Sequence, residues 1–208
     1  MNVTAALSVV VAAGALLVLV VPPIVMYNRF VRQRTLIDES WGQTDVELTR
    51  RHELIPNLVS TVSAYAAHEA TVLEALSRAR EEAAAHQGEA PHSRQRFEDR
   101  LGSAVHDVLV RAEAYPGLKA SANFLQLQDE LTNTEDRIAA ARRFYNGNVR
   151  AYNTRVATFP SNLIANMFGF GSRDFFELRD PAARDAPRVE LDPRPPQGRR
   201  LASPRMTG

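Results

Sequence analysis

The sequence contains no cysteine, which excludes disulfide bonds, a catalytic thiolate and any zinc or iron–sulfur site built on cysteine. It also lacks an excess of one charge, because 25 lysine and arginine residues stand against 24 aspartate and glutamate residues, for a formal net charge of +1. A general nucleic-acid binder needs a basic surface that neutralises phosphates. We therefore predict that the protein has no nucleic-acid partner.

The groups that catalysis needs are also scarce. The five histidines form no metal-binding motif, since His68 and Glu69 begin a zinc-protease pattern but Val72 stands where its second histidine belongs. The ten glycines form no phosphate-binding loop, and no serine and histidine are spaced as a nucleophile and its base. We therefore predict that the protein is not an enzyme and uses no cofactor or metal ion.

Charge is absent altogether near the N-terminus, where no charged residue occurs from Val3 to Tyr27. As a helix rising about 1.5 Å per residue, the leucine- and valine-rich residues 3–21 would span roughly 29 Å, the thickness of a bilayer's hydrocarbon core. A cleaved signal peptide is disfavoured, because no basic residue precedes the apolar run and Ala13-Gly14-Ala15 is a poor cleavage site inside it. We predict a membrane anchor over residues 1–27 that contacts the lipid bilayer through residues 3–27.

The residues that flank this anchor predict its orientation. No basic residue precedes it, whereas Arg29, Arg32 and Arg34 follow it directly. Basic residues beside a membrane span stay on the cytoplasmic side. We therefore expect the N-terminus outside and residues 28–208 in the cytoplasm.

The middle of the sequence has a helical pattern. Between Ile24 and Phe159 only Pro56, Pro91 and Pro116 interrupt it, and apolar residues recur there every three, four or seven positions. No useful stretch alternates with period two. The sequence therefore predicts an all-α protein in which residues 28–178 form an antiparallel up-and-down bundle of about four helices, of roughly 28, 30, 22 and 37 residues.

The joint at Pro56 allows two arrangements. Residues 28–86 form either one long helix kinked at Pro56 or two helices that reverse direction there. The residues around Pro56 contain no loop, which favours the kink. A straight helix of this length, about 88 Å, would leave its lower half poorly covered, which favours the reversal.

The end of the sequence divides into two parts. Residues 159–170 are predicted to form a turn and a short apolar helix ended by Gly169, which caps the bundle or, alternatively, lies on the membrane. The proline- and arginine-rich residues 179–208 predict a disordered tail. The candidate membrane-contact residues are Leu163, Ile164, Met167, Phe168 and Phe170.

Polar residues near Pro56 are candidates for partner binding. Arg50, Arg51 and Asn57 lie beside this proline, whose missing N–H frees a backbone carbonyl in the preceding turn. They form either a notch for a partner or, as we favour, the surroundings of a kink whose open carbonyls are satisfied by Asn57 or a neighbouring helix.

A second group of candidates lies on one face of the last long helix. Arg142, Asn146, Arg150 and Asn153 recur there at helical spacing. Asparagine is unfavourable inside a helix, so the recurrence indicates buried hydrogen bonds or a face that a partner recognises. A solvated face explains the pattern equally well.

Two blocks of sequence carry a family resemblance. The first contains Tyr27-Asn28-Arg29, Trp41, Asp45 and residues 50–59 and 65–69; the second contains residues 115–120, 124–128, 134–146, 152–153 and 159–170. With the anchor, these blocks resemble the LemA family of bacterial membrane proteins over roughly residues 5–177.

The resemblance implies a single-pass anchor in the bacterial cell (inner) membrane, a helical bundle and no catalytic residue. It also implies kinship with proteins associated with membrane invagination in bacterial organelles and with partners of membrane metalloproteases. We predict a membrane-anchored scaffold or adaptor that binds protein partners, with self-association as a further expectation. The alternatives are a membrane-shaping protein, a non-catalytic accessory subunit of a membrane protease and an unrecognised enzyme.

Overall fold

The computed structural model describes residues 3–178, so the expected tail over residues 179–208 lies outside the described part of the chain. Within residues 3–178 every regular element is a helix, which confirms the all-α prediction. The elements are α1 (Val3–Ser63), the 3₁₀ turn η1 (Ala67–Glu69), α2 (Ala70–Ala85), α3 (Pro91–Ala112), α4 (Pro116–Lys119), α5 (Ala122–Ala157) and α6 (Ser161–Phe168).

α1 is a continuous helix of 61 residues that passes through Pro56. Proline cannot donate to the carbonyl four residues before it, and here that carbonyl, of His52, accepts a hydrogen bond from Arg80 Nε of α2 at 3.1 Å. The chain therefore does not reverse at Pro56, and a neighbouring helix supplies the missing bond.

The expectation that the helix reaches residue 86 is wrong, because α1 ends at Ser63. The N–H groups of Tyr65 and Ala66 both bond back to the carbonyl of Val62, at 3.1 and 2.9 Å, and close the last turn. The chain then folds back into α2. This reversal buries Leu73 and Leu76 against the distal end of α1, where a straight helix would have left them in solvent.

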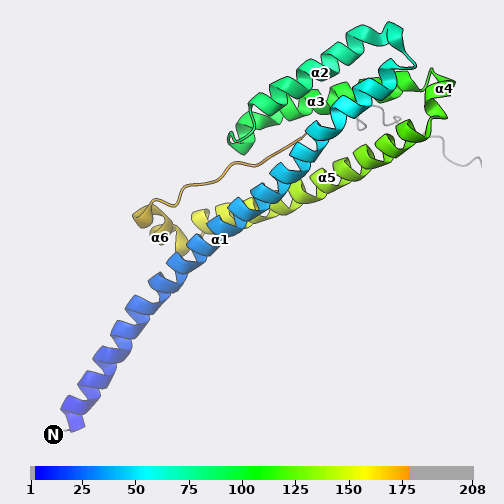
Figure 1. Ribbon diagram of the computed structural model, residues 1–208. Coiled ribbons are helices and arrows are strands. Elements are labelled where there is room, and N and C mark those ends of the chain that lie inside the picture. The colour runs from blue at the N-terminus through cyan, green and yellow to red at the C-terminus, as the bar shows by residue number, and fades with distance from the viewer. Residues whose placement is uncertain (1–2, 179–208) are drawn as a thin grey trace, which may run out of the picture.

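The four long helices form the expected antiparallel bundle, but of unequal lengths. α2 and α3 pack on each other and on the distal end of α1, while α5 runs back along α1 in the opposite direction (Figure 1). The predicted lengths suit α3 and α5, which have 22 and 36 residues. They fail for the first two helices, because the chain reverses after Ser63 and not at Pro56, which lengthens α1 and leaves α2 with 16 residues.

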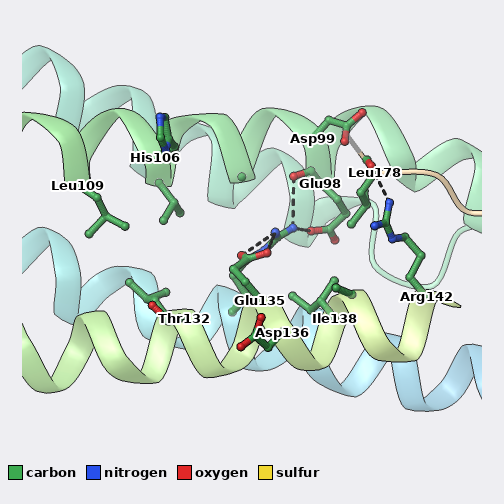
Figure 2. Close-up of a pocket in the computed structure, with 15 residues that line it drawn as sticks. Glu98, Asp99, His106, Leu109, Thr132, Glu135, Asp136, Ile138, Arg142 and Leu178 are labelled. Carbon is green, nitrogen blue, oxygen red and sulfur yellow. Dashed lines mark hydrogen bonds and ion pairs between the residues drawn. The ribbon is translucent and has the colours of Figure 1, made fainter. Parts of the chain in front are cut away.

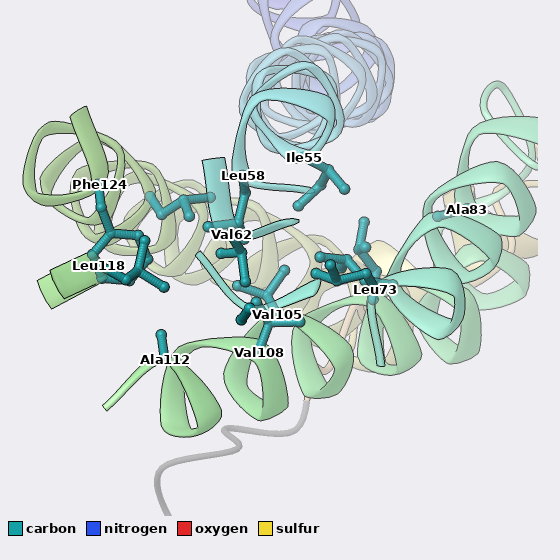
Figure 3. Close-up of a cluster of buried hydrophobic side chains, with 14 of the residues drawn as sticks. Ile55, Leu58, Val62, Leu73, Ala83, Val105, Val108, Ala112, Leu118 and Phe124 are labelled. Atoms are coloured by element: carbon teal, nitrogen blue, oxygen red, sulfur yellow. The ribbon is translucent and has the colours of Figure 1, made fainter. Parts of the chain in front are cut away.

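The buried apolar side chains form two clusters along the bundle. The distal core, which includes Leu58, Val62 and Val105, joins the end of α1 to α2, α3 and the start of α5 (Figure 3). The proximal core, which includes Phe30 and Tyr152, joins α1 to α5, α6 and the residues after α6. Each fully buried Leu, Val or Phe contributes about 1.5–3 kcal/mol, so the two cores stabilise the opposite ends of the bundle.

The N-terminal part of α1 projects beyond the other helices (Figure 1). It is long and apolar enough to cross a membrane, and none of its most apolar stretch is buried. Leu16, Val18 and Leu19 are 65%, 74% and 75% exposed. Contact of these apolar side chains with lipid carries no free-energy cost, whereas their contact with water is unfavourable.

Candidate functional site

A layer of buried charged side chains separates the two cores. On α1, Arg51 and His52 lie between Leu48 of the proximal core and Ile55 of the distal core. On α3, Arg94 and Glu98 are each 1% exposed. Charged side chains are rarely buried without partners, so their hydrogen bonds decide whether the layer is tolerated.

Glu98 is the centre of this ionic layer. Its Oε2 accepts hydrogen bonds from Arg51 Nη2 at 2.6 Å and His52 Nε2 at 3.2 Å, and its Oε1 accepts one from Arg94 Nη2 at 3.2 Å. Arg51 also donates to Glu135 Oε1 of α5 at 3.0 Å. Arg94 makes a further ion pair, with Asp45 of α1.

The pKa values follow from this pairing. Burial alone would raise the pKa of Glu98, but the hydrogen bond with His52 and the positive charge of Arg51 lower it to about 2. Burial likewise opposes the charged form of Arg51, yet the charges of Glu135 and Glu98 raise its pKa. Both groups are therefore held in their charged forms, and neither is set up to exchange a proton near neutral pH.

A groove of about 410 Å³ opens between α3 and α5, directly beside the ionic layer (Figure 2). Its apolar lining includes Val105, Leu109, Leu131 and Ile138. Its charged lining comprises the acidic Glu98, Asp99, Glu135 and Asp136 and the basic Arg51 and Arg142. The groove thus combines apolar walls with an excess of acidic side chains, some of which are already paired.

The chain after α6 runs as an extended segment along α5, and we call residues 170–178 the C-terminal strap. Asn153 binds both backbone groups of Arg173 and Asn146 binds both those of Phe176, with four hydrogen bonds of 2.8 to 2.9 Å. Seven residues of helix span about 10.5 Å, and three residues of extended chain span about 10 Å. The spacing of the two asparagines along α5 therefore matches the spacing of Arg173 and Phe176 along the strap.

Further contacts fix the strap on α5. Arg142 Nη1 donates to the carbonyl of Leu178 at 2.6 Å (Figure 2). Tyr145 Oη donates to the carbonyl of Asp174 at 2.8 Å, and burial raises the pKa of this tyrosine to about 12, so it remains a donor. Phe176 is fully buried, with its ring 5.1 Å from that of Trp41. The strap completes the proximal core.

The candidate partner-binding residues fall into separate places. Arg142, Asn146 and Asn153 bind the strap, whereas Arg150 is exposed. Arg51 belongs to the ionic layer, while Arg50 lies at the surface and pairs with Glu130 at 2.8 Å. Asn57 is exposed. The proposed role of these residues toward a partner protein stays a prediction.

The candidate membrane-contact residues fall into a buried group and an exposed group. Ile164 and Phe170 are 8% and 6% exposed and join the proximal core. Leu163, Met167 and Phe168 are 56%, 74% and 54% exposed. The helix itself ends at Gly169, which has a positive φ of 71°, as the sequence predicts.

Sequence reasoning missed Arg94, Glu98 and Glu135. A signal was present, because Arg94 and Glu98 lie one turn apart on the same face of α3 as Phe97 and Leu101. Charged residues within an apolar stripe indicate buried ion pairs. Within residues 3–178, no three His, Asp or Glu side chains are grouped so that they could hold a metal ion.

Comparison with known proteins gives one family and several partial relatives. The model of the LemA family matches residues 40–191. Protein LemA of Metamycoplasma hominis is 34% identical over 80 residues, which is 38% of this chain and 34% of that protein. Magnetosome protein MamQ 2 of Paramagnetospirillum magneticum is 29% identical over 77 residues, or 37% of this chain and 28% of that protein.

A third relative, magnetosome protein MamQ of Magnetospirillum gryphiswaldense, is 26% identical over 76 residues, or 36% of this chain and 28% of that protein. The chain thus spans about a third or less of the length of these curated relatives. None of the three carries the name of an enzyme. With the apolar part of α1, these likenesses make the chain a membrane-associated helical protein.

Proposed function

Because the chain belongs to the LemA family and α1 links an apolar segment to a bundle without a loop, we propose that it is a membrane-anchored adaptor. In this role it holds a segment of a partner protein at the cytoplasmic face of the bacterial cell membrane. The observation that carries the proposal is the groove between α3 and α5.

The strap indicates how the groove would bind a partner. Its contacts with α5 move from Asn153 through Asn146 to Arg142, and Leu178 at its end lines the groove. The groove therefore continues the same track along α5. Its α5 wall, residues 131–142, is about 16 Å long, which is room for about five residues of extended chain.

The lining of the groove selects the chemistry of that segment. Apolar side chains of the partner would be buried against Leu109, Leu131 and Ile138. A lysine or arginine of the partner would lie beside Asp99, Glu135 or Asp136 at the edge. We propose that the partner presents an extended segment with both apolar and basic side chains.

Photo-crosslinking in native membranes tests this function. A photoreactive residue at Thr132, which is exposed on the groove wall, should form a discrete adduct with another protein. The same residue at Ala75, exposed on α2 outside the groove, is the matched control and should not form that adduct. Ala139→Trp, which fills the groove, should abolish the adduct while the thermal transition remains.

Two outcomes of this experiment would contradict the adaptor function. One is the absence of any adduct at Thr132. The other is an adduct only with residues 179–208 of the same chain, which would make the groove a site for the protein's own C-terminus.

Membrane shaping is a second candidate function, supported by the exposed apolar side chains of α6. Two of the relatives are also named as magnetosome proteins. Reconstitution at increasing protein-to-lipid ratios should then change vesicle curvature in electron micrographs. Vesicles that keep their shape at high protein density would exclude it. The role of accessory subunit to a membrane protease stays a prediction from family resemblance.

A further inference from the structure

One face of α6 and the turn before it expose large apolar side chains. Phe159, Leu163 and Met167 are spaced four residues apart and are 75%, 56% and 74% exposed. Phe168, at the end of the helix, is 54% exposed. The opposite face packs into the proximal core. Such a face on a surface helix needs a cover other than water.

Aromatic contacts place α6 at the point where α1 leaves its apolar segment. The ring of Phe168 lies edge-on to Tyr27 with 4.9 Å between centroids. Phe170 lies 5.5 Å from Tyr27 and stacks on Phe30 at 4.9 Å. Tyr27 lies near the end of the uncharged run, and Arg29 is the first charge after it. Tyrosine followed by basic residues is typical of a membrane–water interface.

The charges at this level suit a lipid surface. α6 carries no charged residue, so its burial among lipids desolvates no ion. An interfacial helix usually carries its own basic face. Here α1 supplies it instead, because Arg29, Arg32 and Arg34 are exposed within two turns of Tyr27. Their guanidinium groups can pair with lipid phosphates.

We propose that α6 lies in the interface of the same bilayer that α1 crosses, with Phe159, Leu163, Met167 and Phe168 among the acyl chains and head groups. The bilayer is the favoured cover because the apolar face is continuous with the membrane segment through Tyr27. This inference is independent of the adaptor function. Membrane shaping would require it, but α6 can lie in a bilayer without deforming it.

Spin labelling of the full-length protein tests the position of α6, and the absence of cysteine makes each label unique. Met167→Cys carries a nitroxide in vesicles of phosphatidylcholine with a minority of phosphatidylglycerol. Phe144→Cys, 55% exposed on α5, is the matched control, and Val20→Cys lies within the anchor. Collisions with oxygen report lipid, and collisions with a soluble nickel chelate report water.

We expect the ratio of oxygen to nickel collisions at residue 167 to be several-fold higher than at residue 144 and to approach that at residue 20. Equal ratios at residues 167 and 144 would overturn the proposal. So would a label at 167 that is shielded from both reagents and broadened by a second label, since this face would then join two copies of the chain. Crosslinking at Thr132 in the groove would be unaffected by either result.

Discussion

Glu98 shows how one residue decides whether charges can remain between two apolar cores. It is 1% exposed and accepts from Arg51, His52 and Arg94. Burying ions costs several kcal/mol each, which their attraction offsets only when every partner is present. Removing Glu98 leaves two arginines without their shared carboxylate, although Glu135 and Asp45 remain beside them.

We therefore expect Glu98→Gln to lower the free energy of unfolding by about 3 kcal/mol at neutral pH. The pKa of Glu98 is near 4.5 when exposed and about 2 in the fold. The carboxylate therefore stabilises the fold fully above about pH 4.5, and this contribution is lost as pH falls toward 2. Denaturant titrations followed by circular dichroism, from pH 7 down to 2, measure both effects.

Asp107→Asn, which neutralises an exposed carboxylate on the same helix, is the matched control and should change stability little. The difference in stability between the native chain and Glu98→Gln should shrink below pH 4.5. A difference that stays constant down to pH 2 would show that Glu98 is not held as a carboxylate by the layer.

Among the elements, the strap is held mainly by side chains of α5. Asn146 and Asn153 each bind a backbone N–H and a backbone carbonyl, which gives the strap the hydrogen bonds that a neighbouring strand would otherwise supply. Phe176 then fills the space beside Trp41. Three of the four polar residues on this face of α5 are thus occupied within the chain.

We expect Asn146→Leu to release the strap, because two backbone groups of Phe176 lose their partners at a cost of about 1–3 kcal/mol. Hydrogen exchange of the Phe176 amide should accelerate roughly tenfold or more. Asn133→Leu, at an exposed position on the same helix, is the control and should leave this amide protected. Unchanged exchange in Asn146→Leu would show that Phe176 and its neighbours hold the strap without the asparagine.

The sequence predicts α3 and α5 but does not predict the reversal that follows α1. The stripes of α3 and α5 predicted both helices because each buries one continuous face. The reversal over residues 64–69 contains neither glycine nor proline. It is imposed by burial of Leu73 and Leu76 in the distal core, which no local pattern reports.

The candidate site was less accessible than the fold. The groove forms only when α3 and α5 lie on either side of Arg51 of α1, which is a tertiary arrangement. The strap has no periodic pattern by which the sequence could reveal it. The asparagines of α5 did predict buried hydrogen bonds, but only beside a face recognised by a partner and a solvated face, because only their helical spacing is visible in the sequence. The identity of their partner, ten or more residues beyond the end of α5, depends on tertiary structure.

At the scale of the whole molecule, orientation in the membrane decides which compartment the groove faces. Arg29, Arg32 and Arg34 follow the apolar segment, and we expect them to keep the bundle in the cytoplasm. A C-terminal alkaline phosphatase fusion should be inactive and a C-terminal green fluorescent protein fusion should be fluorescent. Replacing the three arginines with glutamine should reduce this bias, and an active phosphatase on the native sequence would reverse the assignment.

The unbroken course of α1 also sets a height. Arg51 lines the groove, and it follows Tyr27 by 24 residues of one helix. With Tyr27 at the membrane surface, the part of the groove beside Arg51 lies at most about 36 Å above it. About eleven extended residues are enough for a partner with its own membrane span to cover that distance. Tilting α1 would lower the groove toward the membrane and shorten the segment that a partner needs. Because bilayer thickness affects helix tilt, membrane thickness and the choice of partner are linked through the length of a single helix.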